Sequence, residues 1–202
     1  SSRILGANPV ENEELNMFTR ICNRLGIRGW CPGSSGNASF LLPDRGLVYI
    51  KTSGKPMAFL STSDVVAIDM DGNVVEGKGK PSKEFKFHLG SYKTRKDVKA
   101  VIHTHSPYAT AFAIANKELP MKTTPGRIVL KKVPSIAYAS PGSEDLALRV
   151  VECFKDQEVH AALLRDHGVV ATGKTLIEAN SIAEWVEDAA KEVFLSLIIS
   201  SS

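Results

Sequence analysis

The sequence predicts an α/β protein, in which helices alternate with strands that pair as hairpins along 202 residues. Three observations carry this prediction. Residues 13–25 have apolar side chains at three- and four-residue steps, which is typical of an amphipathic helix. Residues 41–50 and 65–75 each have turn-forming residues between two apolar runs, which is typical of a hairpin. Residues 175–197 again have helical apolar spacing, and we expect a long helix that packs against the core or another subunit.

The composition narrows the classes of function. The formal net charge is only +3 and no dense run of lysine and arginine is present, so we expect no nucleic-acid partner, whereas a small anionic substrate suits the charge. No secretory signal and no apolar run long enough to cross a bilayer is visible, so we expect no membrane partner. The three cysteines are scattered and lack CxxC spacing, which fits a reducing cytoplasm. No repeat or linker divides the chain, and we expect a single domain over residues 1–202.

Two loops rich in small residues follow the first helix, which should end at Gly26. Residues 29–40 lead into a strand, and their glycines allow backbone N–H groups to approach an anion closely. A plain surface turn is the alternative, and Cys31 in this loop is interpreted as structural or incidental. The loop lacks both the GxGxxG pattern of a dinucleotide site and the GK[ST] of a Walker loop. Residues 52–54 form a second element of hydroxyl residues and glycine at a strand end.

Turn and cap signals define the elements around these loops. The hairpin of residues 41–50 should turn at residues 43–46, and that of residues 65–75 at Asp71-Gly72. Residues 61–64 offer an N-cap to a short helical turn between the two hairpins.

A helix is predicted over residues 81–94, and its first turn is a candidate phosphate site. Free N–H groups and the positive end of the helix dipole favour an anion there, and Ser82 and Lys83 could add a hydroxyl and a cation. Glu84 lies in the same turn, with His88 one turn later on the same face. A carboxylate that only stabilises the helix dipole is the alternative interpretation of Glu84.

Three histidines are candidate metal ligands. Residues 100–102 form an apolar, β-branched run that should enter the core as a strand. Side chains alternate along a strand, so His103 and His105 should point to the same face, where two imidazoles can hold one divalent cation. His167 lies at a polar corner between two apolar strands of residues 161–173 and is a natural third ligand. Ordinary strand and turn histidines, satisfied by hydrogen bonds, are the alternative.

The remaining elements complete the alternation of strands and helices. Ser106 should cap a helix over residues 108–115, and residues 140–144 should cap a helix that runs to Phe154. Residues 128–138 are predicted as strands interrupted by a proline.

Five short motifs together resemble the class II aldolase/adducin-type family, in the same order and over residues 15–195. They are Ser35-Gly36-Asn37-Ala38-Ser39, Thr52-Ser53-Gly54, Lys80-Pro81-Ser82-Lys83-Glu84, His103-Thr104-His105-Ser106 and Asp166-His167-Gly168. The resemblance implies a three-layer α/β/α sandwich around a mixed, largely antiparallel sheet, assembled as a homotetramer.

The resemblance also implies a site and an activity. His103, His105 and His167 would hold a divalent metal, most often Zn²⁺, with Mn²⁺, Co²⁺ or another divalent ion as alternatives and an open position for substrate. Glu84 would be the acid/base in the retro-aldol cleavage of a ketose phosphate, and the metal would stabilise the enediolate. The implied phosphate pocket comprises Gly36, Asn37, Ser53, Gly54, Ser82 and Lys83. Asp166 could orient a ligand or be an exposed turn carboxylate.

Other activities of the same family stay open. Aldolases of the family have serine at the position of Lys83, and lysine there resembles the branch that decarboxylates 3-oxo-tetronate 4-phosphates. Pentulose-5-phosphate 4-epimerases typically have aspartate at the position of Glu84, so glutamate favours an aldolase or a decarboxylase. A methylthioribulose-1-phosphate dehydratase shares the histidine motif. The non-enzymatic alternative is an adducin-type scaffold, against which the intact histidine and glutamate set argues. An HxH hydrolase would be longer and alternate strand and helix more regularly.

Overall fold

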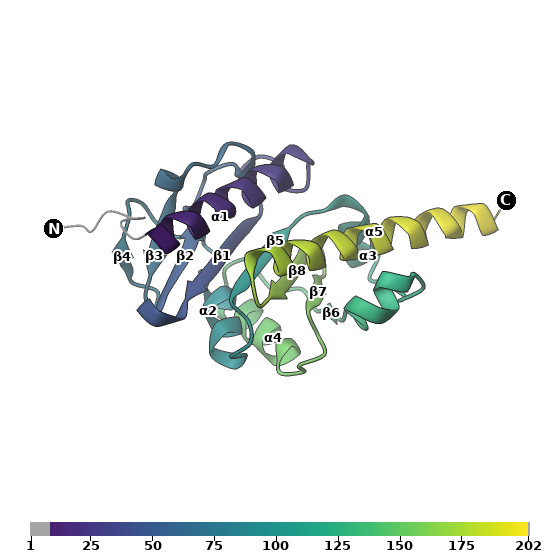
Figure 1. Ribbon diagram of the computed structural model, residues 1–202. Coiled ribbons are helices and arrows are strands. Elements are labelled where there is room, and N and C mark those ends of the chain that lie inside the picture. The colour runs from purple at the N-terminus through teal and green to yellow at the C-terminus, as the bar shows by residue number, and fades with distance from the viewer. Residues whose placement is uncertain (1–8, 202) are drawn as a thin grey trace.

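The computed structural model describes residues 9–201 and has one twisted sheet at its centre (Figure 1). Within the described residues the sheet has eight strands in the order β4-β3-β2-β1-β5-β8-β7-β6, and every neighbouring pair is antiparallel except β6 and β7. The strands are β1 (Asn37–Leu42), β2 (Leu47–Lys51), β3 (Val65–Ile68), β4 (Val74–Glu76), β5 (Ala100–Thr104), β6 (Ser135–Ile136), β7 (Ala161–Leu164) and β8 (Gly168–Gly173).

Helices cover both faces of the sheet. They are α1 (Pro9–Ile27), α2 (Phe85–Thr94), α3 (Pro107–Ile114), α4 (Glu144–Phe154) and α5 (Leu176–Ser200). One apolar cluster joins α1, α3 and α5 to one face, and a second joins α2 and α4 to the other. Burial of both faces explains why every residue of the central strands β5 and β8 is buried, instead of every second residue. The expected three-layer sandwich around a mixed, largely antiparallel sheet is confirmed. Among the described helices none is long and apolar enough to traverse a bilayer.

The predicted turns form for local reasons. The β1–β2 hairpin turns through the short helical turn η1 (Pro43–Arg45), and Gly46 ends it with φ 61°, a left-handed conformation that glycine adopts without strain. Gly72 does the same between β3 and β4 with φ 91°. The short turn η3 (Thr62–Asp64) has the predicted cap, since Ser61 and Asp64 form a capping box. The Ser143 hydroxyl accepts from Leu146 N–H at the start of α4.

The structure corrects two of the predicted elements. Helix α2 begins at Phe85, because the Ser82 N–H donates to Lys51 O and ties residues 81–82 to the end of β2 instead. Residues 128–138 are mostly not strands: a π-helical turn, η4 (Gly126–Leu130), comes first, and only β6 pairs in the sheet. Ile128 is 69% exposed, so its β-branched side chain has no sheet layer to pack against.

The register of the central strands places the histidine motif. Asn37 of β1 lies opposite His103 of β5, and His103 lies opposite Val170 of β8. The turn from β7 to β8 directly precedes β8, and Asp166 in this turn is exposed and has φ 54°. Gly168 then passes so close to β5 that a Cβ there would lie 2.4 Å from Thr104 O. A side chain is excluded at this point, and the turn that contains His167 therefore lies directly over the end of β5.

Candidate metal centre

Three histidines from two parts of the chain converge at one end of β5. One ring nitrogen from each of His103, His105 and His167 lies within 4.8 Å of the others. His103 Nε2 and His105 Nε2 are 3.1 Å apart. His103 is on β5 itself, His105 follows it two residues later on the same face, and His167 comes from the β7–β8 turn. Two ring nitrogens this close, with a third beside them, form the donor set of a three-histidine cation site with an open fourth position.

Hydrogen bonding and burial prepare these rings to bind a cation. His103 Nδ1 lies 2.8 Å from Val169 O and donates to it, which leaves Nε2 as the unprotonated nitrogen of the neutral ring. Burial and then the nearby His105 lower the pKa of His103 to about 3. Burial and then His103 lower the pKa of His167 to about 4, and burial lowers that of His105. All three rings are therefore neutral near pH 7, the form that binds a metal ion. Histidines with only a structural role would have their buried ring nitrogens hydrogen-bonded. His167 Nδ1 has no hydrogen-bond partner among the described residues, which argues against that alternative.

Glu84 lies at the open side of the histidine cluster. Its Oε2 is 3.3 Å from His103 Nε2, and its Oε1 is 3.4 Å from His167 Nε2. Glu84 is 7% exposed, and Asn37 Nδ2 donates to Oε2 at 2.9 Å. Oε1 makes no hydrogen bond within residues 9–201. The carboxylate could complete the coordination of a cation or exchange a proton with a molecule bound to it.

A cavity of about 360 Å³ opens beside the histidines and Glu84. All six residues that the family resemblance assigns to the phosphate pocket line it, together with Glu84, His105 and His167. The lining residues are Ser34, Ser35, Gly36, Asn37, Lys51, Ser53, Gly54, Ser82, Lys83, Glu84, His105, Pro141 and His167. Because α2 begins at Phe85, the N–H groups of Ser82 and Glu84 are already bonded, to Lys51 O and Ser82 Oγ. The expected cluster of free N–H groups at Ser82 is therefore wrong.

Lys51 is a cavity residue that the sequence analysis missed. It is 2% exposed, and its ammonium donates to the backbone oxygens of Ser34 at 3.2 Å and Lys55 at 2.5 Å. No carboxylate of the described residues pairs with it, and burial lowers its pKa. A buried cation without a counter-charge attracts an anion from solution. Its position directly before Thr52-Ser53-Gly54 is the sequence signal that could have identified it.

Cys31 has a structural position near this cavity. It is 3% exposed, and a Cβ at Gly36 would lie 2.4 Å from its sulfur. Gly36 has φ 71°, so both the backbone and the packing require glycine there. Cys22, Cys31 and Cys153 are all unpaired, as the sequence predicts.

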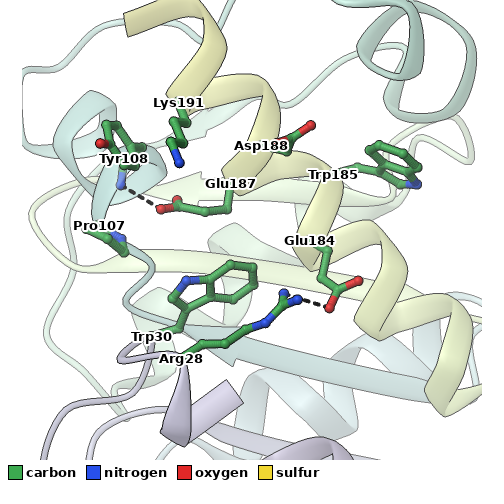
Figure 2. Close-up of a pocket in the computed structure, with 9 residues that line it drawn as sticks. All are labelled: Arg28, Trp30, Pro107, Tyr108, Glu184, Trp185, Glu187, Asp188 and Lys191. Atoms are coloured by element: carbon green, nitrogen blue, oxygen red, sulfur yellow. Dashed lines mark hydrogen bonds and ion pairs between the residues drawn. The ribbon is translucent and has the colours of Figure 1, made fainter. Parts of the chain in front are cut away.

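A second cavity, of about 450 Å³, lies against α3 and α5 on the other face of the sheet (Figure 2). The Glu187 carboxylate points from α5 to the start of α3, where it accepts from Tyr108 N at 3.0 Å and Ala109 N at 2.9 Å. Arg28 pairs with Glu184 at 2.8 Å and lies over the Trp30 ring. We call this the aromatic cavity. No motif in the sequence predicted it.

Comparison with known proteins identifies the family. Residues 16–194 match the family described as Class II Aldolase and Adducin N-terminal domain. The L-fuculose phosphate aldolase of Methanocaldococcus jannaschii is 38% identical over 182 residues, which are 90% of this chain and 96% of that protein. The 3-oxo-tetronate 4-phosphate decarboxylase of Escherichia coli is 34% identical over 92% of this chain and 88% of its own. A solved L-fuculose 1-phosphate aldolase superposes with a TM-score of 0.86 at 32% identity, covering 93% of this chain and 87% of its own.

The chain belongs to the class II aldolase and adducin family. The resemblance inferred from five short motifs is thereby confirmed, and so is the fold that it implied. The roles assigned to individual residues stay predictions, which the geometry above supports.

Proposed function

We propose that this protein is a metal-dependent sugar-phosphate aldolase that cleaves a ketose phosphate by a retro-aldol reaction. One observation supports the proposal: three histidine nitrogens lie within 4.8 Å of one another, beside the buried Glu84 carboxylate, whose Oε1 has no hydrogen bond among the described residues. The adjacent cavity contains Lys51, which has no carboxylate partner among the described residues. A scaffold protein that uses only the fold has no need of this set, because buried polar atoms without partners destabilise a fold. The relatives at 34–38% identity are named as enzymes that act on phosphorylated sugars or sugar acids.

The cavity explains how such a substrate would bind. Its phosphate would lie against the loops at Gly36 and Gly54, which line the cavity and have positive φ values of 71° and 81°. The Ser53 and Ser82 hydroxyls can donate to phosphate oxygens, and the Lys51 ammonium supplies a positive charge. The other end of the substrate then reaches the histidines and Glu84.

His103, His105 and His167 would hold the cation, with Zn²⁺ favoured by a three-histidine set and Mn²⁺ or Co²⁺ as alternatives. When bound, the cation supplies a Lewis acid that draws electron density from the substrate carbonyl. Glu84 Oε1 is the protein atom placed to accept a proton from the substrate hydroxyl and to return it to carbon. Burial of Glu84 keeps bulk water from that exchange.

Decarboxylation of a 3-oxo-tetronate 4-phosphate is the second candidate. Lys83 is exposed and lines the cavity, so its ammonium could pair with a carboxylate on the substrate. The match to the decarboxylase of Escherichia coli covers 92% of this chain, and the match to the aldolase of Methanocaldococcus jannaschii covers 90%. The intact site serves both reactions, since each needs a carbonyl polarised by the cation.

We expect the protein to be a cytoplasmic homotetramer. The last part of α5 extends from the body of the molecule (Figure 1) and exposes a cluster of large apolar side chains that a neighbouring subunit would cover. These side chains are Phe194, Leu195, Leu197, Ile198 and Ile199. Light scattering of the purified protein tests this assembly.

A substrate panel with metal-loaded protein tests the activity. Ketose 1-phosphates should be cleaved to two carbonyl products, and 3-oxo acid phosphates should release CO₂ only under the second proposal. Glu84→Gln should lower kcat by roughly 10²- to 10⁴-fold, as expected for loss of an acid/base group, with the metal content unchanged. Glu152→Gln, an exposed change on α4, is the matched control. A fully active Glu84→Gln on the true substrate would refute the assigned role.

A further inference from the structure

A buried chain of hydrogen bonds runs from Glu84 into the space between α2 and β1. Asn37 Nδ2 donates to Glu84 Oε2 at 2.9 Å, and Asn37 Oδ1 lies 2.5 Å from His88 Nε2. His88 Nδ1 lies 2.7 Å from Ser39 Oγ, which in turn lies 2.6 Å from the Tyr92 hydroxyl. None of these five side chains is one of the three histidines that form the cation site, and none is in a residue more than 7% exposed. We call this series the Glu84 chain.

The backbone explains why the Glu84 chain can form. Glu84, His88 and Tyr92 are four residues apart at the start of α2 and along it, so they lie on one side of the helix about 6 Å apart. Asn37 and Ser39 are two residues apart on β1, so they share a face of the sheet at a spacing of about 6.7 Å. These spacings nearly match, and each strand residue therefore lies between two helix residues.

Proton counting gives the Glu84 chain one direction. An ionised carboxylate only accepts hydrogen bonds, so the NH₂ group of Asn37 must face Glu84 and its oxygen must face His88. His88 Nε2 must then bear the ring proton, and Nδ1 must accept from the Ser39 hydroxyl. Since Ser39 has only one proton to donate, Tyr92 must donate to Ser39.

The surroundings of His88 support a neutral ring in one tautomer. His88 is fully buried, and its ring stacks on Phe87 with centroids 4.6 Å apart. Burial and then the nearby His103 lower the pKa of His88 to about 3. The ring therefore stays neutral near pH 7 and holds the orientation of the Asn37 amide.

We propose that His88 is a positioning residue, which fixes the Asn37 amide so that Glu84 Oε2 is held in the protein and Oε1 alone faces the substrate. The inference rests on the proposed aldolase function, because it concerns the oxygen of Glu84 that exchanges the proton. It assigns a purpose to a histidine outside the three metal ligands. It also separates the two oxygens of Glu84, of which one is bonded and the other is not.

Substitutions at His88 test the positioning role. His88→Phe fills the space but cannot donate to Asn37, and we expect kcat to fall on the order of 10- to 100-fold, as for other residues that orient a reacting group. KM for the phosphorylated substrate and the bound metal per chain should not change. His88→Gln can place an N–H near the position of Nε2 and should restore most of kcat. His160→Phe, at a half-buried histidine away from the site, is the matched control.

The tautomer of His88 is a second readout that does not depend on activity. Nitrogen-15 NMR of the zinc-loaded protein should show His88 protonated on Nε2 and not on Nδ1, with the signal assigned by its absence in His88→Gln. Ser39→Ala, a smaller change than His88→Phe, should lower kcat in the same direction and guards against misfolding of the larger variant.

The outcomes separate this inference from the proposed function. A fully active Glu84→Gln on the true substrate would overturn the function assigned to Glu84. An inactive Glu84→Gln combined with wild-type kcat in His88→Phe and Ser39→Ala would overturn the positioning role alone. Protonation of His88 on Nδ1 would overturn the direction of the Glu84 chain whatever the kinetics. A loss of bound metal in both His88→Phe and Ser39→Ala would assign them a structural role instead.

Discussion

The cavity lined by Glu84, His105 and His167, here called the histidine cavity, differs from the aromatic cavity in how its charged groups are paired. Around the histidine cavity, Glu84 Oε1 has no hydrogen bond and Lys51 has no carboxylate partner within residues 9–201. In the aromatic cavity, Glu184 pairs with Arg28 and Glu187 accepts from two backbone N–H groups (Figure 2). The aromatic cavity is the larger of the two, at about 450 Å³ against about 360 Å³, so volume does not distinguish the candidate active site.

The difference shows which property identifies a reactive site. A buried polar atom that lacks a partner is unfavourable in a folded protein, and where such an atom faces a cavity beside three convergent histidines a ligand can supply the partner. A buried group that is fully bonded, such as Glu187, stabilises the fold. We therefore expect substitutions in the histidine cavity to change activity and those in the aromatic cavity to change stability.

Removal of the metal should have the largest effect. Chelation, or His103→Ala, should reduce the activity to background, because the substrate carbonyl is no longer polarised. The thermal midpoint should also fall, since a ligand present at about 1,000 times its Kd stabilises the fold by about 4 kcal/mol. Activity assays with metal added back and differential scanning fluorimetry measure both effects. Unchanged activity after complete removal of bound metal would contradict the assignment.

Acidification of the metal-free protein should change the free energy of unfolding in opposite directions through the buried histidines and through Glu187 of the aromatic cavity. The pKa of His88 and of His103 is about 3 in the folded state and about 6.5 in the unfolded state. Their contribution to the free energy of unfolding is therefore complete above pH 6.5 and is lost as the pH falls toward 3. Each contributes up to about 1.4 kcal/mol per pH unit in that window. Burial raises the pKa of Glu187, so its contribution changes in the opposite direction, declining as the pH rises through its folded pKa. Urea unfolding at several pH values measures the slope, and a flat profile below pH 6.5 would contradict the histidine contribution.

Lys51→Met should weaken substrate binding by an intermediate amount. Methionine has a similar shape without the charge, so the phosphate loses a charge-assisted hydrogen bond of about 1.5–3 kcal/mol, or roughly a 10- to 150-fold loss in kcat/KM. Most of the loss should appear in KM. Lys93→Met, at an exposed position of α2, is the control. An equal loss with an unphosphorylated analogue would show that Lys51 does not bind the phosphate.

Glu187→Ala should have the smallest effect on activity and a clear effect on stability. The first N–H groups of α3 lose their acceptor, which should lower the free energy of unfolding by about 1–2 kcal/mol, as for loss of a helix cap. We expect the thermal midpoint to fall by a few degrees and kcat to stay unchanged at temperatures where the variant is folded. Glu192→Ala, an exposed change on the same helix, controls for charge. A large loss of kcat in the folded variant would contradict the expectation that substitutions in the aromatic cavity change stability and not activity.

The features predicted from the sequence are those fixed by neighbours along the chain. The turns at Gly46 and Gly72 need positive φ, and the spacing of His103 and His105 places them on one face of a strand. The start of α2 was misplaced because the bond from Ser82 N–H to Lys51 O joins distant segments. Lys51 and the aromatic cavity were missed for the same reason. The role of His167 comes from the family resemblance and not from local spacing, since its approach to β5 depends on the pairing of β5 with β8.

Gly168 determines how closely the third histidine can approach the other two. A Cβ there would lie 3.2 Å from the His103 ring and 3.1 Å from the His105 ring, as well as 2.4 Å from Thr104 O. Because Thr104 O is a backbone atom, an added methyl group at this position would force the β7–β8 turn, and His167 with it, away from the end of β5. The lack of any side chain at Gly168 is therefore a requirement for the third imidazole to reach the other two.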